Sequence, residues 1–407
     1  MFHEKQMFIQ KNQHCYLVAA SSYMVLTGIL SDGFVQAYMN KLGMTAQMIG
    51  LYGALAQIAA MVAYACSTSF LSGPAIFQRS YLLATFGLLA MPTGLFLSHV
   101  ISNPLIVTFI LVIAGMMYQA LIAIRGTSEY DLIPYLIPRS IYGTLLGRAG
   151  VIGGLSAVGL TMLSHSLIDK IGFPQGYDLL FLITALTCLL SGTAVKRLRI
   201  VYPAAEQKKT RLKVNTAFQL ALQTPRYRKQ LLPHIFRGIG NAGLYFFLTI
   251  AMQGFSMEAR DITLVTILSV AFSAIANFSF SKINRRIHTG IITLISACVC
   301  AGCLIADSFF HSRTLFFFLY ALYIFANAMN QLGIAVGVMG NTTVEDLPLI
   351  SALRMLLTAG MTSLFTLLFG KLLDSASSLW AVLPASCAFI LCGILCSRLF
   401  TDEMMER

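Results

Sequence analysis

The chain has 407 residues, of which 57% are apolar and only 11% are charged, and its formal net charge is +12. Soluble domains carry about 25% charged residues, so this chain has too few charges to cover a surface that faces water. Its lysines and arginines lie in short segments between long apolar runs, and we find no glycine-rich phosphate loop, RNA-binding signature or zinc-ligand spacing. The composition therefore predicts a lipid bilayer around the chain and argues against nucleic acid as a partner.

Twelve apolar runs are long enough to cross a membrane, because a spanning helix needs about 20 mostly apolar residues. They cover residues 15–38, 46–70, 80–98, 104–124, 141–167, 178–195, 233–254, 261–281, 288–307, 314–338, 350–370 and 379–398. The first run is too long for the apolar part of a cleavable signal peptide, so we expect it to be retained as a span. The sequence predicts an all-α integral membrane protein with twelve transmembrane helices.

Lysines and arginines are divided unequally between alternate connections. If the N-terminus is cytoplasmic, roughly four times as many lie on the inside as on the outside, with Arg125 counted in the inside loop after the fourth span. Three more, Arg148, Arg237 and Arg354, fall within spans. Such a bias sets the orientation of membrane helices. We expect a multi-pass protein of the cell (inner, cytoplasmic) membrane with both termini in the cytoplasm.

One connection, residues 196–232, is longer and more basic than the others and divides the spans six and six. The predicted domains are residues 1–195, the cytoplasmic linker 196–232, and residues 233–407. The two halves are similar to each other: "GTSEYDLIP" from Gly126 matches "GNTTVEDLP" from Gly340, and "LLGRAG" and "LLTAG" follow at a common spacing. This parallel duplication predicts two pseudo-symmetric six-helix bundles related by an axis along the membrane normal.

With these features the chain resembles a major facilitator superfamily transporter over its whole length. The segment "RGTSEYDLIPYLIPRSIYG" is similar to the acidic, proline and arginine element after the fourth span of many members, and "FSKINRRIHTG" resembles the basic loop that recurs in both halves. The second-to-third loop departs from the family pattern, since it keeps Arg79 but lacks the usual Asp-Arg core. In "GTLLGRAGVIGG", Arg148 stands where the antiporter element has a proline, which argues against a drug antiporter.

The resemblance implies alternating access around a central cavity lined by the first, fourth, seventh and tenth spans. Polar side chains recur on these spans at intervals of three and four residues, which places them on one helix face. Lipid cannot form hydrogen bonds with these side chains, so they face protein or a water-filled cavity. The alternative, that they form hydrogen bonds that hold helices together, stays open. The predicted substrate-binding residues are Gln36, Tyr118, Gln119, Arg237, Asn241, Tyr245, Tyr323, Asn327, Asn330 and Gln331.

Charged residues within and beside the spans predict coupling and gating. Asp32 lies in the outer half of the first span, where lipid favours the protonated carboxyl, so we predict it as the proton-coupling residue, with a water-exposed or capped carboxylate as the alternative. Three embedded arginines against one embedded carboxylate favour an anionic or zwitterionic substrate, because guanidinium binds carboxylate and phosphate well. Snorkelling to lipid phosphates, or salt bridges to nearby carboxylates that close a cytoplasmic gate, are the alternative roles of the arginines. The predicted gating residues are Glu129, Asp131, Arg148, Glu345, Asp346 and Arg354.

The function predicted from the sequence is secondary active transport of a small organic solute by alternating access, coupled to a proton or another ion. We expect a monomer with no cofactor and no metal site, and we do not expect an enzyme, because no nucleophile–base or metal-ligand set occurs at a suitable spacing. Two alternatives remain open: a drug or metabolite efflux antiporter, and a non-transporting lipid-handling or sensory protein on the same fold.

Overall fold

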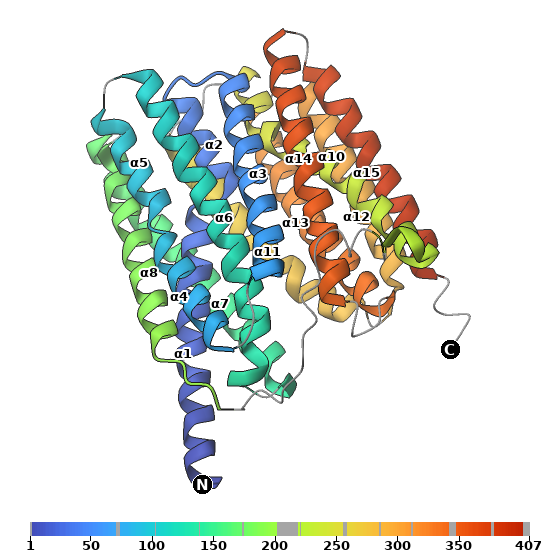
Figure 1. The fold of residues 1–407 in the computed structure, drawn as a ribbon. Coiled ribbons are helices and arrows are strands. Elements are labelled where there is room, and N and C mark those ends of the chain that lie inside the picture. The colour runs from blue at the N-terminus through green and yellow to red at the C-terminus, as the bar shows by residue number, and fades with distance from the viewer. Residues whose placement is uncertain are drawn as a thin grey trace. The chain divides into compact units, whose positions relative to one another are not determined.

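The computed structural model describes residues 2–70, 74–101, 103–137, 139–172, 175–201, 219, 221–254, 259–284, 286–310, 312–341, 347–375 and 378–401. Every regular element within these ranges is a helix (Figure 1), which confirms the all-α prediction. Large apolar side chains such as Leu83, Leu105 and Leu155 lie 71%, 74% and 71% exposed on the outside of the helices. Side chains of this kind belong in lipid, and the chain is a multi-pass membrane protein.

Nine helical segments in the described part of the chain, some of them with a short break, are long and apolar enough to cross a membrane. They are Met7–Gln36, Ala46–Ser67, Pro74–Ser98, Leu105–Glu129, Gln175–Lys196, Thr289–Phe309, Arg313–Val338, Leu353–Asp374 and Val382–Phe400. The other three predicted spans fall on α7, α10 and α11, of which α7 and α11 carry the shorter apolar stretches Arg148–Leu163 and Leu264–Phe280. Each of the twelve predicted runs therefore falls on helix, while the number that cross the bilayer stays a prediction.

The chain divides into two compact units. Unit 1 comprises Met1–Ser31 and Ala59–Arg211, and unit 2 comprises Asp32–Ile58 and Leu212–Arg407. The helices of unit 1 are α1 (Phe2–Ile29), the second part of α3 (Ala46–Phe70), α4 (Pro74–Gly87), α5 (Ala90–Val100), α6 (Pro104–Leu136), α7 (Arg139–Ile171), η1 (Gln175–Tyr177) and α8 (Asp178–Lys196). Those of unit 2 are α2 (Asp32–Lys41), the first part of α3, α10 (Pro225–Gly254), α11 (Ala259–Ile283), α12 (Thr289–Phe309), α13 (Arg313–Asn341), α14 (Leu347–Ser375) and α15 (Ser378–Thr401).

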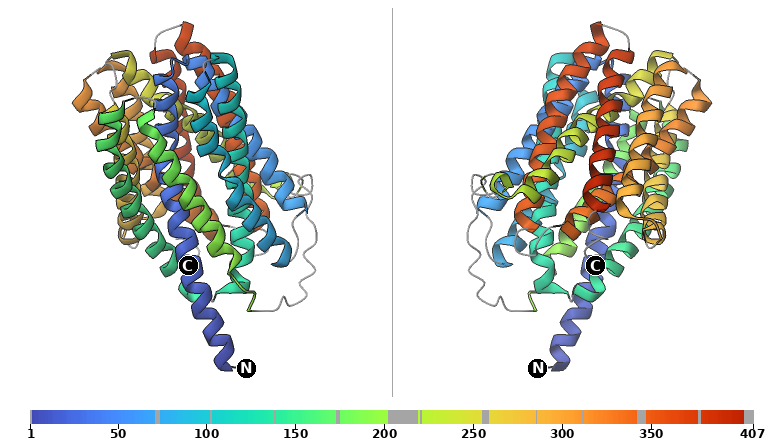
Figure 2. Two further views of the ribbon diagram at one scale, coloured as in Figure 1. Left: turned by 90° about the vertical axis from the view of Figure 1, so that its left-hand side faces the viewer. Right: turned by 90° about the vertical axis from the view of Figure 1, so that its right-hand side faces the viewer.

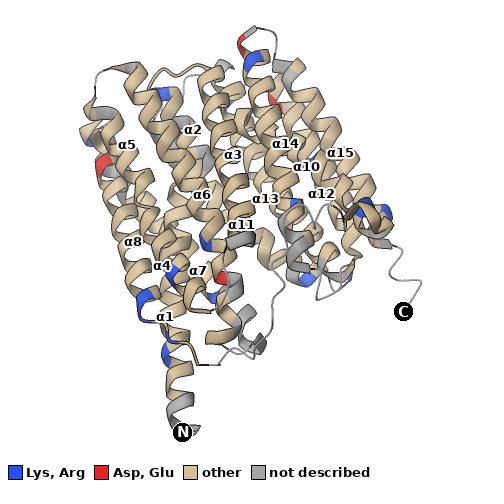
Figure 3. Cartoon of the chain, viewed as in Figure 1, with Lys and Arg blue, Asp and Glu red and all other residues tan. Residues whose placement is uncertain are grey.

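Each unit has its own apolar core. In unit 1, α1 packs against α7 and α8 (Figure 2), and the core beside it includes Tyr16, Phe77 and Leu132. In unit 2, α12 packs against α13 and α15, and α10 packs against α14 and α15. In unit 1, lysines and arginines gather at the helix ends next to the N-terminus (Figure 3). This arrangement agrees with the predicted orientation, which stays a prediction.

The first predicted span is interrupted, and this break coincides with the boundary between the units. Helix α1 ends at Ile29 and α2 begins at Asp32, so Leu30 and Ser31 separate two helices where the sequence predicts one. Glycines at positions 28 and 33 flank the break, and glycine weakens a helix by about 1 kcal/mol relative to alanine. The segment Asp32–Ile58 belongs to unit 2, although Met1–Ser31 before it and Ala59–Arg211 after it belong to unit 1.

Candidate functional site

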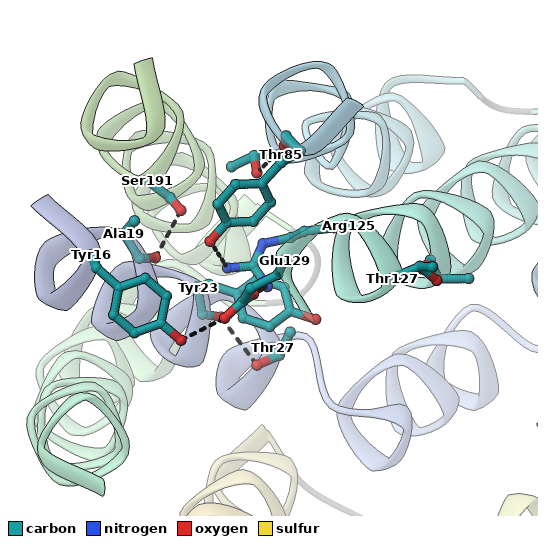
Figure 4. Close-up of polar contacts among 11 residues, drawn as sticks. Tyr16, Ala19, Tyr23, Thr27, Thr85, Arg125, Thr127, Glu129 and Ser191 are labelled. Carbon is teal, nitrogen blue, oxygen red and sulfur yellow. Dashed lines mark hydrogen bonds and ion pairs between the residues drawn. The ribbon is translucent and has the colours of Figure 1, made fainter. Parts of the chain in front are cut away.

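Unit 1 holds a buried arginine between three helices. We call this group the Arg125 cluster; it consists of Tyr16 and Tyr23 on α1, Tyr81 on α4, and Arg125 and Glu129 on α6. Arg125 and Glu129 are one helical turn apart, so their side chains share one face of α6. Figure 4 shows Tyr16 and Tyr23 of α1 pointing toward this pair.

Glu129 and two tyrosine hydroxyls of the Arg125 cluster are linked by short polar contacts to one another or to Arg125. Arg125 Nη1 lies 2.8 Å from Glu129 Oε2, and the Tyr16 hydroxyl donates a 2.6 Å hydrogen bond to Glu129 Oε1. Arg125 Nη2 donates to the Tyr81 hydroxyl oxygen at 3.0 Å, and the guanidinium carbon lies 3.4 Å from the centroid of the Tyr23 ring. Among the described residues, Arg125 Nε has no hydrogen-bond partner. The cluster therefore contains one cation, one anion and three phenol groups in a site shielded from water.

The prediction that Arg125 lies in a loop is wrong. We counted it in a cytoplasmic loop, whereas it lies in α6 and only 3% of its side chain is exposed. Helix α6 continues to Leu136 because Leu132, Ile133 and Leu136 pack in the core of unit 1. Glu129 was predicted as a gating residue, and its ion pair in the described structure is with Arg125.

Unit 2 also holds a buried arginine, but with different partners. The Arg237 cluster consists of Arg237 on α10 with Asn327 and Asn330 on α13. The guanidinium donates to Asn330 Oδ1 and, at 3.2 Å, to Asn327 Oδ1. Asn330 in turn donates from Nδ2 to the Thr293 carbonyl oxygen of α12 at 3.0 Å, which fixes the orientation of its amide. Arg237 is 5% exposed, and no described carboxylate forms an ion pair with it.

A third polar contact in unit 2 joins α10 to the segment Asp32–Ile58. Gln57 Nε2 of α3 donates to the Tyr245 hydroxyl at 2.8 Å, and Asn40 Nδ2 of α2 lies 3.5 Å from Thr249 Oγ1. One turn before Asn40, Gln36 is 1% exposed, and neither polar atom of its side chain has a partner among the described residues. These contacts show that α2 and the first part of α3 pack on the same helix that carries Arg237.

The structure brings some of the predicted substrate-binding residues together and separates others. Arg237, Asn327 and Asn330 are in direct contact, while Tyr245 meets Gln57, which the sequence analysis missed. Gln57 is a lone polar residue in an apolar run, and this isolation was the sequence feature that could have marked it as a candidate site residue. The remaining predicted residues are Gln36, Tyr118 and Tyr323, which are buried, Gln119 and Asn241, which are half-buried, and Gln331, which is exposed. Their roles in binding stay predictions.

The coupling and gating predictions are only partly covered by the structure. Glu345 and Asp346 lie outside the described residues, and for Asp32 and Asp131 only the backbone is described, at the start of α2 and within α6. Arg148 is exposed and Arg354 is half-buried. No group of three or more metal-ligating side chains occurs among the residues that the structure describes.

Comparison with known proteins identifies the fold. No family model and no curated protein matches the sequence. Solved structures do match it over nearly the whole chain. The nucleoside transporter NupG has a TM-score of 0.63 at 13% identity and covers 97% of this chain and 98% of its own. The human organic anion transporter MFSD10 has a TM-score of 0.59 at 13% identity, and the match covers 96% of this chain and 99% of MFSD10. The major facilitator superfamily proton:xylose symporter XylE has a TM-score of 0.62 at 10% identity, and the match covers 96% of this chain and 95% of XylE. The chain therefore has the fold of the major facilitator superfamily transporters.

Proposed function

We propose that the chain is a secondary transporter that carries a small organic anion or zwitterion across the membrane by alternating access. The observation that carries this proposal is the buried guanidinium of Arg237, whose described partners are two uncharged amide oxygens. Solved transporters with this fold include ones named for nucleosides, xylose and organic anions, so the fold alone does not select a substrate.

The electrostatics of the Arg237 cluster favour an anionic ligand. Removing an arginine from water costs several kcal/mol unless an opposite charge compensates it, and amide oxygens supply only part of that compensation. A carboxylate or phosphate binds guanidinium through two parallel hydrogen bonds, which is the strongest pairing available to this side chain. A substrate with one such group would balance the charge of the Arg237 cluster.

The polar groups along α10 favour a ligand that also makes uncharged hydrogen bonds. Asn241 lies one turn from Arg237, and its Oδ1 atom is buried without a partner among the described residues. Gln36 offers a buried donor and a buried acceptor that are likewise unpartnered. Buried polar atoms are normally bonded, so unpartnered ones in a membrane protein suggest positions that a ligand or water occupies.

The division of the chain supports alternating access. The chain passes from unit 1 to unit 2 at the break between α1 and α2, and it returns to unit 1 inside α3, after Ile58. Helix α2 and the first part of α3 therefore belong to unit 2, whereas α1 and the second part of α3 belong to unit 1. Two compact units with separate apolar cores can move as separate bodies, as alternating access requires. Coupling to a proton at Asp32 and cytoplasmic location of both termini remain part of the proposal.

Counterflow into proteoliposomes tests the proposal. Vesicles that contain the purified chain are preloaded with one unlabelled anion, and the uptake of the same labelled anion is followed for lactate, succinate, glycerol 3-phosphate and glucuronate in turn. We expect transient accumulation of at least one of these anions, and its loss in Arg237→Gln. Arg286→Gln removes an exposed cation of unit 2 and serves as the matched control that should leave counterflow unchanged.

Two outcomes would contradict the proposal. An Arg237→Gln variant that exchanges every responsive anion at the rate of the parent would remove Arg237 from the substrate site. Tight binding of an anion without exchange would instead favour a sensory or lipid-handling protein on the same fold.

A further inference from the structure

We infer that the substrate site of unit 2 takes an organic dianion whose two negative charges are on separate groups, such as a dicarboxylate, with one group at Arg237 and the other at Arg354. This inference rests on the proposed function and narrows its substrate class. The observations that carry it are the packing of α10 against α14 and the charges of the described groups around Arg237.

Helix α14 lies directly along the part of α10 that carries Arg237. Thr358 Oγ1 donates to the His234 carbonyl oxygen at 3.3 Å, and one turn later Thr362 Oγ1 donates to the Gly238 carbonyl oxygen at 3.0 Å. A Cβ atom at Gly238 would lie 2.6 Å from the Thr358 carbonyl oxygen, so the two backbones are in contact there. Residue numbers rise together along both helices, which therefore run parallel in a fixed register.

This register brings a second arginine to the site. Arg354, which is half-buried, lies one turn before Thr358 on α14 and is therefore level with the turn of α10 that precedes His234. Arg237 lies about two turns, or about 10 Å, further along the helix axis. His234 lies between the two arginines, is 4% exposed, and interacts electrostatically with both. The two guanidinium groups therefore belong to one positively charged region.

The spacing of the two arginines favours two separate anionic groups. Arginine keeps its charge throughout the physiological pH range, and each guanidinium binds a carboxylate best through two parallel hydrogen bonds. A single doubly charged group would have to satisfy both arginines at one point, although their backbone positions are about 10 Å apart along the axis. A dicarboxylate with a short chain between its groups offers one carboxylate to each arginine.

No carboxylate interacts with Arg237 among the groups that the structure describes around it. The groups that do interact are the thiol of Cys300 on α12, the phenol of Tyr323 on α13, and the thiols of Cys392 and Cys396 on α15. None of these is a carboxylate, so a negative charge that enters with the substrate adds the compensation that the described neighbours of Arg237 lack.

The buried carboxylates that the structure describes in unit 2 lie elsewhere. Asp261 pairs with Arg313 at 2.7 Å. Asp307 lies about 20 Å along α12 from Thr293, the α12 residue that bonds to the Arg237 cluster. The ammonium group of a small zwitterion held at this cluster would therefore meet a second cation instead of a carboxylate. Because like charges repel, the region favours a dianion over a zwitterion.

Competition during counterflow compares a dianion with its matched monoanion. Succinate, glutarate and adipate are each paired with their monomethyl ester, which has one charge fewer at slightly alkaline pH. Proteoliposomes that contain the full chain are preloaded with a dicarboxylate, and entry of the same labelled dicarboxylate is inhibited by either compound. For at least one pair we expect the parent to need about tenfold more of the monoester for half-maximal inhibition, the loss that follows from removing hydrogen bonds to a charged group.

Substitution of Arg354 tests which residue reads the second charge. Arg354→Gln should raise the half-maximal concentration of the dicarboxylate by about tenfold and leave that of the monoester unchanged, because the monoester keeps the group that binds Arg237. Arg354→Lys retains the charge and should retain most of the preference. Arg286→Gln removes an exposed cation and should alter neither value. A purely structural role of Arg354 would instead change both ligands equally.

The outcomes separate this inference from the proposed function. Equal inhibition by each dicarboxylate and its monoester in the parent, or an Arg354→Gln variant that keeps the preference of the parent, would overturn the inference and leave the transport proposal intact. If the parent exchanges no anion, the transport proposal fails, and thermal unfolding of the purified chain at constant ionic strength decides the inference. A dicarboxylate must then raise the unfolding midpoint more than its monoester in the parent but not in Arg354→Gln, and equal or absent shifts would overturn it.

Discussion

The same substitution at the two buried arginines should change the stability of the chain by very different amounts. Arg125→Met and Arg237→Met each replace a guanidinium by an unbranched apolar side chain. In unit 1 the change leaves Glu129 buried beside Tyr16 without its cation. In unit 2 the change leaves two neutral amides, one of which keeps its hydrogen bond to Thr293. The contrast follows from the different charge balance of the two clusters.

The expected changes in the free energy of unfolding differ clearly between the two variants. Removing one partner of a buried ion pair costs about 3–5 kcal/mol, because the remaining charge is uncompensated. Removing Arg237 gives up two hydrogen bonds from a charged donor, worth about 1.5–3 kcal/mol each, but also removes a desolvation penalty of several kcal/mol. We therefore expect Arg125→Met to lower the free energy of unfolding by about 3–5 kcal/mol, and Arg237→Met to change it by roughly 1 kcal/mol or less.

The assay is reversible unfolding of the purified chain in mixed micelles at neutral pH, with chloride and other small anions kept low. The double variant Arg125→Met/Glu129→Leu is the matched control, since it removes both charges and should recover most of the lost stability. If Arg237→Met is destabilised as strongly as Arg125→Met, then the amide oxygens fully compensate Arg237. The electrostatic argument for an anionic substrate would then be wrong.

Two further predictions concern packing and the start of the linker. In Gly153→Ala a Cβ atom would lie 2.5–2.6 Å from atoms of α1, so we expect a loss of about 1–3 kcal/mol in unfolding free energy, whereas Gly150→Ala, which meets nothing within 4 Å, should not destabilise the chain. Asn12→Ala removes hydrogen bonds of 2.7 and 2.9 Å to the backbone of Arg199, so trypsin should cleave after that residue faster than in the parent or in the control Lys11→Ala. Unchanged cleavage in Asn12→Ala would show that these bonds do not hold the segment in place.

The all-helical membrane fold could be predicted because the signal is long and repeated. Each span is a run of about 20 apolar residues, because the bilayer has one thickness and its lipid cannot form hydrogen bonds with the backbone of any span. The break between Ile29 and Asp32 was not predicted, although Gly28, Ser31 and Gly33 stand beside it, because the apolar residues on both sides together make a run long enough for one span. It depends on which unit each half of the run packs against, and that choice is made by residues distant in sequence.

The boundary of α6 shows a second limit of sequence analysis. A window of apolar residues ends at position 124, so Arg125 and Glu129 read as loop residues. In the structure α6 continues for twelve more residues to Leu136, because its next turns bury apolar side chains in unit 1. The spacing of four between Arg125 and Glu129 was visible in the sequence, but it becomes informative only when the helix is extended through both.

The polar residues of α10 illustrate why helical spacing alone does not define a binding site. With 3.6 residues per turn, each step of four residues rotates the side chain by about 40°, so positions 237 and 245 differ by about 80°. Arg237 accordingly meets α13, whereas Tyr245 meets Gln57 of α3. The residues with the predicted spacing are close along the helix but contact different neighbours.

The most direct test of the central claim is the exchange of a labelled organic anion by vesicles that contain the purified chain. The account predicts that an unlabelled anion inside the vesicles accelerates entry of the labelled one, and that Arg237→Gln abolishes this acceleration while Arg286→Gln does not. Entry that is independent of the internal anion, or that is equal in the parent and Arg237→Gln, would contradict it.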